Sequence, residues 1–341
     1  MESLLKITKM KSSRLLKSKL AVMLAWGLSI GFQANAQQEV MYSQYMFNTL
    51  AINPSYAGSR DVLSLTALGR YQWIGVPGSP NTHSFSLDMP IKNEKMGIGL
   101  TAFNDAIGIA NNTGINLAYA YRVKVGDRTT LSLGVQGGVT NVSLAFSKIK
   151  EINDINNDPA FNNNANINKL IPNVGGGLFI SNDKSYLGFS VPQIIEQKLP
   201  GTVSGKVQRH YFLMMGFVVG KGNIKMKPST MIRYTQGVGA GFDGNINFWF
   251  KDKIAIGFSG RKSQTVLSGQ DAIDAVVGMF ELQLTPQLRV GYAYDYNMNR
   301  LNDKSNANST YNKLTGTPTH EWLLRYEFGY GKNKILTPRY F

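Results

Sequence analysis

From residue 61 onward, apolar and polar residues alternate along the chain with a period of two. In residues 62–73, for example, Leu63 and Leu65 occupy one face, and Ser64 and Arg70 occupy the other. Such alternation predicts β-strands with one apolar and one polar face. Fourteen strands are predicted in this way, over residues 62–73, 82–89, 97–103, 115–123, 131–140, 172–181, 185–191, 207–220, 225–235, 242–250, 253–260, 272–284, 288–296 and 319–328.

The connections between these strands are sorted by length. Every second connection is tight and polar, namely residues 92–95, 125–128, 182–185, 220–223, 251–253 and 285–287. Most of the others are longer, residues 143–170 and 298–318 much longer, and only the one near residues 237–241 is short. This pattern is typical of an outer-membrane barrel whose short turns face the periplasm. The predicted fold is therefore all-β, a transmembrane antiparallel β-barrel of about 14 strands over residues 61–329, with short periplasmic turns and longer extracellular loops.

Aromatic residues cluster near the ends of the apolar faces, as girdles at the two membrane interfaces would require. They are Tyr71, Trp73, Tyr121, Trp249, Tyr294, Tyr296, Trp322, Tyr326 and Phe328. A soluble β core would also contain aromatic residues, but it buries only one face of each sheet and needs no secretory leader. The ending Tyr326-Glu-Phe328 is the alternating aromatic pattern expected of the last strand of an assembled barrel.

Residues 1–36 have the three parts of a secretory signal peptide. A basic region extends to Lys19, an apolar run covers residues 20–32, and the small residues Ala34 and Ala36 mark a cleavage site after Ala36. A retained membrane anchor is the alternative, but the apolar run is shorter than the roughly 20 residues that a spanning helix needs. We therefore expect the mature protein to begin at Gln37 and to leave the cytoplasm.

Residues 37–60 lie between the signal peptide and the first strand. Tyr45 and Phe47 fall on roughly helical spacing, and Asn53-Pro54 and Gly58 predict a tight corner. An ordinary N-terminal arm packed on the body is one interpretation. Because the segment is too apolar and aromatic for a solvated tail, we predict a periplasmic or plug segment that closes the barrel. Residues 330–341 are expected to form a basic periplasmic tail, for which a disordered end is the alternative.

The composition narrows the chemistry. The 341 residues carry a net charge of +15, three histidines and no cysteine. The missing cysteines exclude disulfides and thiol sites, and no catalytic or metal-binding motif is present, so we expect no enzyme activity, no cofactor and no metal. Basic residues are spread over turns and loops, which favours contact with outer-membrane lipid and lipopolysaccharide and argues against nucleic acid.

The polar faces of the strands carry charges of both signs. A lattice of paired charges inside the barrel is one interpretation, because unpaired charge in a confined interior is costly. A selective channel is the other, and fourteen strands enclose enough space for either. The residues concerned are Arg70, Asp88, Arg122, Glu281, Arg289, Asp295, Glu321, Arg325 and Glu327.

Several short motifs occur in order along the mature chain. They are Ser43-Gln-Tyr-Met-Phe-Asn48, Asn53-Pro-Ser-Tyr-Ala-Gly-Ser59, Arg70-x-Gln-Trp73, Asn104-Asp-x-Ile-Gly108, Asn112-Thr-Gly114, Tyr119-Ala-Tyr-Arg122, Leu284-Thr-Pro-Gln-Leu-Arg289, Gly291-Tyr-x-Tyr-Asp295, His320-Glu and Arg325-Tyr-Glu-Phe328. Together they resemble the PorP/SprF family of the type IX secretion system. The resemblance implies an outer-membrane barrel of Bacteroidota, in a Gram-negative cell, that works with the type IX translocon. Some members associate with periplasmic machine components, and others serve one large secreted adhesin in gliding bacteria.

Two functions follow from these observations. The first is an outer-membrane component of the secretion machinery that binds a protein partner, either an exported adhesin or a machine subunit, for secretion, surface display or gliding. The second is a diffusion channel or uptake porin for small solutes. The resemblance favours the first, with the outer loops engaging the exported protein. The residues expected to bind machine components are Tyr45, Phe47, Asn48, Asn53, Pro54, Tyr56, Gly58, Arg339, Tyr340 and Phe341.

Overall fold

The computed structural model describes residues 41–92, 94–147, 166–198, 206–236, 238–263, 273–298 and 318–328, all within one compact unit, Ala36–Phe341. The predicted signal peptide and the tail with Arg339, Tyr340 and Phe341 lie outside the described residues, as do most of the two longest predicted loops. In the part of the chain that is described, no helix has the length and apolar character that a membrane crossing requires.

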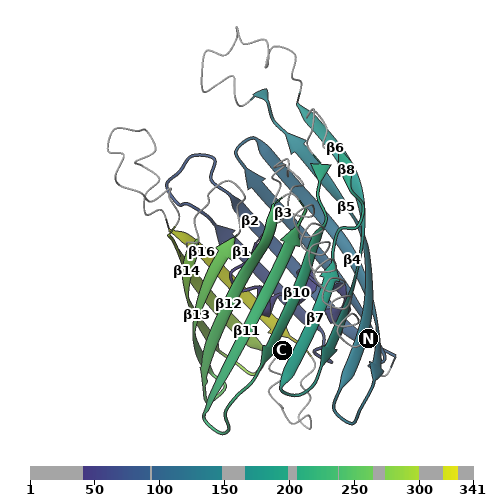
Figure 1. The fold of residues 1–341 in the computed structure, drawn as a ribbon, viewed down its shortest axis with the longest axis vertical. Coiled ribbons are helices and arrows are strands. Elements are labelled where there is room, and N and C mark those ends of the chain that lie inside the picture. Colours follow the sequence, from purple (N-terminus) through teal and green to yellow (C-terminus); the bar gives the residue numbers. More distant parts are fainter. Residues whose placement is uncertain are drawn as a thin grey trace, which may run out of the picture. The chain divides into compact units, whose positions relative to one another are not determined.

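Fourteen antiparallel strands of the described residues close into one barrel (Figure 1). The first strand pairs with both the second and the last, so that Ser64 lies opposite Asp88 on one side and Glu327 on the other. This confirms the predicted fold class. The strands are β1 (Ser64–Tyr71), β2 (Asn81–Ile91), β3 (Met96–Ile107), β4 (Ala110–Lys124), β5 (Thr130–Leu144), β6 (Ile167–Ser181), β7 (Ser185–Val191), β10 (His210–Phe217), β11 (Ile224–Thr235), β12 (Gly239–Phe250), β13 (Ile254–Ser263), β14 (Ala275–Gln283), β15 (Leu288–Asn297) and β16 (Thr319–Glu327).

Alternation of side chains along each strand separates the lumen from the outer face. On β1, Ser64, Thr66 and Arg70 are buried inside the barrel, whereas Tyr71 is exposed on the outside. The predicted short turns lie at one end of the barrel, which we name the turn end, and the opposite end is the loop end. The strands differ in length: β1 has 8 residues and β5 has 15.

The connection between β3 and β4 differs from the expected longer loop. The two strands continue to a tight turn at Gly108 and Ile109, where Gly108 adopts a positive φ of 56°. Asn104 stabilises this hairpin by donating to Asn111 Oδ1 (2.7 Å) and Thr113 Oγ1 (2.8 Å). The hairpin was not predicted because polar residues on either side of the turn, Asn104, Asp105, Asn111 and Asn112, interrupt the apolar alternation although the strand pairing continues.

The predicted strand 207–220 is divided in the structure. Its first residues form β9 (Lys206–Val207), which pairs with β8 (Gln197–Lys198) in a small separate sheet, and the barrel strand is β10. The chain after β7 turns inward because Pro192 O accepts hydrogen bonds from Gln136 Nε2 and Asn173 Nδ2, both 3.0 Å. A connection folded into the lumen therefore replaces part of a simple strand.

Trp249 does not belong to the outer aromatic girdle. Its side chain is 1 % exposed and lies in the lumen, where Lys227 Nζ is 4.2 Å and the Arg289 guanidinium 4.6 Å from the ring centroid. Both distances fit cation–π contacts. The prediction failed because Trp249 alternates with the outward residues Phe248 and Phe250, and a single aromatic residue does not reveal its face. Trp322, Tyr294 and Tyr296 are exposed on the outer face as expected.

Candidate functional site

Residues 41–60 occupy the lumen of the barrel, and we name this segment the plug. It contains three single-turn 3-10 helices, η1 (Tyr45–Phe47), η2 (Thr49–Ala51) and η3 (Pro54–Tyr56). Its apolar side chains form the main hydrophobic cluster together with lumen-facing strand residues such as Phe179 and Met214. Burial in this cluster raises the pKa of the Tyr45 phenol above its ordinary value. The plug is thus part of the core of the barrel.

Ser43 and Gln44 hold the plug at the loop end. Both backbone amides donate to the Glu321 carboxylate, at 2.8 and 2.7 Å, and Ser43 Oγ donates to Asp295 Oδ2 at 2.6 Å. Arg70 pairs with Asp295 (2.7 Å) and Glu321 (2.8 Å) and also donates to Ser43 Oγ (2.6 Å). All these groups are buried, so each carboxylate has a cation and an N–H or O–H donor to replace water.

Asp243 extends this network along the barrel wall to β12 and β13. Its carboxylate accepts from Arg261 Nε at 2.7 Å and from Arg233 Nη1 at 3.1 Å, and Arg261 reaches back to Ser43 Oγ at 3.2 Å. These three residues were missed in the predicted lattice. Arg261 lies just beyond the predicted strand end at residue 260, but β13 continues to Ser263, so that its side chain enters the lumen.

The middle of the plug approaches the strand backbones closely. Asn53 Nδ2 donates to Leu178 O (3.0 Å), and Ser190 Oγ donates to Ile52 O (2.9 Å). The Asn53 side chain also caps η3 by accepting from Ser55 N at 3.0 Å. Lumen-facing glycines make this approach possible, since a Cβ at Gly97, Gly134 or Gly177 would overlap Ala57 O, Ser55 N or Asn53 Oδ1, respectively. Glycines on the polar face of a predicted strand were a signal that could have revealed the plug.

Gly58 and Arg60 hold the plug at the turn end. Gly58 N donates to Asp88 Oδ2 (2.9 Å), and Gly58 O accepts from Arg122 Nη1 (2.7 Å). Arg60 pairs with Glu327, the last residue of β16, at 2.6 Å. The positive φ of Gly58 (72°) explains why glycine occupies this corner. Since Ser43 meets the loop end of β16 and Arg60 meets its turn end, the plug runs the length of the lumen, from the loop end downward.

This position changes the interpretation of the predicted partner-binding residues. The segment was predicted to be a periplasmic or plug segment, and its described residues, 41–60, lie inside the barrel. Tyr45, Phe47, Asn48, Asn53, Pro54, Tyr56 and Gly58 are all buried there. In this conformation they offer no surface to a periplasmic protein, because the lumen wall already satisfies their apolar and polar groups.

The other predicted lumen charges lie near the turn end around Trp249. Arg289 Nη1 is 3.8 Å from Glu281 Oε2, and Arg325 Nε donates to Thr66 Oγ1 at 3.3 Å. Glu281 and Arg325 are both nearly inaccessible to solvent. Of the nine predicted lattice residues, Arg70, Asp88, Arg122, Asp295, Glu321 and Glu327 contact the plug directly. These charges therefore connect the plug to the barrel as well as to one another.

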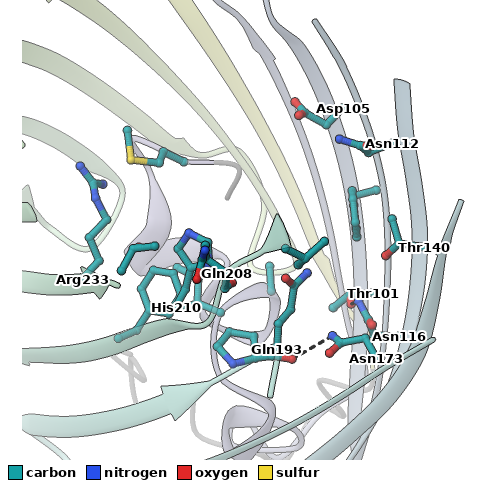
Figure 2. A pocket seen from close by; sticks show the side chains of 18 of the residues that line it. Thr101, Asp105, Asn112, Asn116, Thr140, Asn173, Gln193, Gln208, His210 and Arg233 are labelled. Atoms are coloured by element: carbon teal, nitrogen blue, oxygen red, sulfur yellow. Dashed lines mark hydrogen bonds between the residues drawn. The ribbon is translucent and has the colours of Figure 1, made fainter. Parts of the chain in front are cut away.

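A cavity opens above the plug at the loop end (Figure 2). Its floor includes Tyr42 and Ile52 of the plug with Phe212 and Met231 of the strands. Its walls are rich in uncharged amides. Gln208, His210 and Arg233 lie on one side of the cavity and Asn112, Asn116 and Thr140 on the other, with Gln193 near Asn173.

Most of the polar side chains that line the cavity are uncharged. Asn173 uses its amide N–H to hold Pro192 O, and its buried Oδ1 has no hydrogen-bond partner among the described residues. An acceptor in this state favours a ligand with N–H or O–H donors. No group of three or more metal-ligating side chains occurs in the described ranges.

The family comparison decides the identity of the chain. The profile described as "Type IX secretion system membrane protein PorP/SprF" matches residues 34–312, which is more than half of the chain. The chain belongs to the PorP/SprF family. The motif resemblance noted in the sequence is thereby confirmed. A PorP/SprF chain with this barrel fold is an outer-membrane protein of a Gram-negative cell, as predicted.

Several solved structures are similar to this PorP/SprF barrel. They include the TodX deltaS2S3 mutant monoaromatic hydrocarbon channel (10% identity, 82% of this chain and 93% of that chain, TM-score 0.49). Others are the CymD monoaromatic hydrocarbon channel (11%, 88% and 95%, 0.47) and the Ralstonia pickettii toluene transporter TbuX (8%, 82% and 93%, 0.46). No curated protein matches the chain in sequence.

Proposed function

We propose that this protein is a non-enzymatic component of the type IX secretion machinery that holds a segment of an exported polypeptide at its loop end. The observation that carries the proposal is the combination of a plugged lumen with an amide-lined cavity above the plug. A diffusion pore needs a continuous path, whereas a partner-binding barrel needs a recessed surface and a closed floor.

The chemistry of the cavity supports a polypeptide ligand. Asparagine and glutamine amides can both donate to and accept from peptide groups, and the apolar floor can cover the side chains of an extended segment. Among the described residues, the charged side chains of the lining are Asp105 and Arg233, so the bound segment is expected to be mostly uncharged. Family membership supports an exported protein, an adhesin or another cargo, as its source.

Filling the cavity tests this function. Asn112→Trp combined with Val238→Trp places two indoles in the cavity and leaves the plug contacts intact. In a strain that lacks the gene, this variant should insert normally but fail to restore the cargo at the cell surface, measured by surface biotinylation and mass spectrometry. Val125→Trp, at an exposed position of the turn end, is the matched control and should restore export fully.

Two outcomes would contradict the proposal at different levels. Normal export by the filled-cavity variant would show that the cavity is not the binding surface. An unchanged secreted proteome after deletion of the gene, together with slower uptake of a solute, would establish the alternative of an uptake porin.

The C-terminal tail is proposed as the contact with periplasmic machine components. It follows β16, which ends at the turn end of the barrel. Removing residues 331–341, including Arg339, Tyr340 and Phe341, should leave the barrel inserted and heat-modifiable on gels but abolish cargo export. Normal export by this truncated chain would assign the tail no role in the machine.

A further inference from the structure

The outer, membrane-facing surface of the barrel carries a groove over β15, β16, β1 and β2. It has a volume of about 720 Å³, and Ala67, Gly69, His83, Phe280, Tyr292 and Trp322 contribute to its lining. None of these outward side chains takes part in the plug network or in the cavity at the loop end. The groove and the cavity at the loop end share only Ser84 in their linings and lie on different faces of the barrel wall.

Small residues of β1 form the floor of the groove. Gly69 lies between Trp322 of β16 and His83 of β2 in the strand register, and Ala67 lies between Leu324 and Phe85. A Cβ at Gly69 would come to 3.5 Å from His83 Nδ1, so the imidazole leans over the glycine. A slot one strand wide thus separates two ridges of large side chains, of which Trp322 is 58 % exposed.

Polar groups are confined to the loop end of the slot. His320 and Tyr71 form the next row upward, and β1 ends at Tyr71. Tyr292 Oη lies 2.6 Å from His320 Nδ1 and fixes this imidazole, while the rings of Tyr71 and His83 make an edge contact with centroids 5.4 Å apart. Tyrosine, tryptophan and histidine at this level are typical of the membrane interface, and the groove below them lies at the depth of the acyl chains.

We propose that this groove binds one acyl chain of a phosphorylated glycolipid of the outer leaflet, with His83 and His320 contacting its head group. Along the membrane normal, the apolar part of the site lies at the level of the acyl chains, and its imidazoles lie at the level of the lipid head group. An imidazole N–H is a good donor to a phosphate oxygen. Because the loop end faces outward in barrels of this class, the matching lipid comes from the outer leaflet.

Filling the slot tests the acyl-chain contact. The full-length barrel, extracted from native outer membranes in mild detergent, should retain about one glycolipid, measured by native mass spectrometry and by lipid extraction. Gly69→Leu should reduce this to about none, since its side chain enters the slot. Gly137→Leu is the matched control, because Gly137 also faces outward on a strand, with nothing within 4 Å of an added Cβ. It should retain the lipid.

The head-group contact is tested separately. His83→Leu with His320→Leu keeps the groove apolar and should weaken retention of the phosphorylated glycolipid without weakening that of its dephosphorylated form. Trp322→Ala removes one wall and should also release the lipid, which provides a second reading if Gly69→Leu folds poorly. Equal retention by these variants and the control would overturn the proposal. Specific retention of a phospholipid, or of a membrane protein, in place of the glycolipid would overturn it as well.

Discussion

Several lumen-facing positions of the strands are glycines, and the absence of a side chain there makes room for the plug. Gly97, Gly134 and Gly177 leave room for the plug backbone, and no larger residue could occupy these positions without overlap. The buried charges are the opposite case, because their removal would leave a partner unpaired. Glycines and charges therefore set the position of the plug together, the first by space and the second by hydrogen bonds.

The glycine contact predicts the effect of one added side chain. Gly134→Val should displace the plug at Ser55 and lower the free energy of unfolding by about 1–3 kcal/mol, as overpacking of a core does. The shift can be followed by the temperature at which the heat-modifiable band disappears on gels. Gly137→Val, three residues along the same strand but facing outward, should have little effect. Equal stability of the two variants would contradict a plug held against β5.

Arg70 predicts the cost of breaking the loop-end network. Arg70→Met keeps most of the side-chain volume but removes the cation that faces Asp295 and Glu321. The variant should lose about 3–5 kcal/mol of stability, because the buried Glu321 loses its cation and Asp295 keeps only the longer contact with Arg261, at 3.7 Å. Adding Asp295→Asn and Glu321→Gln to Arg70→Met should recover part of this loss. A single variant that unfolds like the wild type would show that the network contributes little.

At the scale of elements, the strands and the presence of a plug segment could be predicted from the sequence, but the path of the plug could not. Alternation depends only on neighbouring residues, so fourteen strands and most of their turns followed from it. The exception is the hairpin at Gly108, where asparagines on both strands interrupt the apolar alternation. The plug depends on contacts between distant segments, such as Asn53 with Leu178. Its aromatic content indicated burial, but neither its direction nor its partners could be read from local sequence. The inward fold at Pro192 was missed for the same reason.

Because the plug occupies the lumen, we expect it to keep the conductance of the barrel low. Deleting residues 41–59 should leave a less stable barrel with a higher single-channel conductance in planar bilayers, because the segment occupies the lumen. Tethering the plug to the barrel wall should keep the conductance as low as in the wild type. Asn48 and Ser84 are hydrogen-bonded at 3.5 Å, so Asn48→Cys with Ser84→Cys can link plug and β2 in this cysteine-free chain and should keep conductance low. An intact protein that conducts like an open porin would contradict this assignment.

The two ends of the barrel differ, and this difference predicts how the barrel is oriented in the membrane. Short turns and the end of β16 lie together, while the longer connections and the start of the plug lie at the other end. We expect the turn end to face the periplasm. The first described residue of the plug, Met41, then lies on the outer side, where it lines the cavity.

Cysteine labelling tests this direction. Met41→Cys should react with a small membrane-impermeant maleimide on intact cells, whereas Lys184→Cys, in an exposed turn, should react only after the outer membrane is permeabilised. Both should label fully in denaturant. Labelling of Lys184→Cys alone on intact cells would reverse the orientation of the barrel.

The bond between Ser43 and Glu321 joins positions 278 apart in the sequence, and it has a consequence for the time course of biogenesis. The chain is synthesised from its N-terminus, so the carboxylate that receives the start of the plug is made with the last strand. A chain interrupted before β16 also lacks Glu327, the partner of Arg60. Its early aromatic residues then remain accessible to periplasmic proteases. The N-terminal plug is thus protected from proteolysis only after the last strand, β16, has joined the barrel.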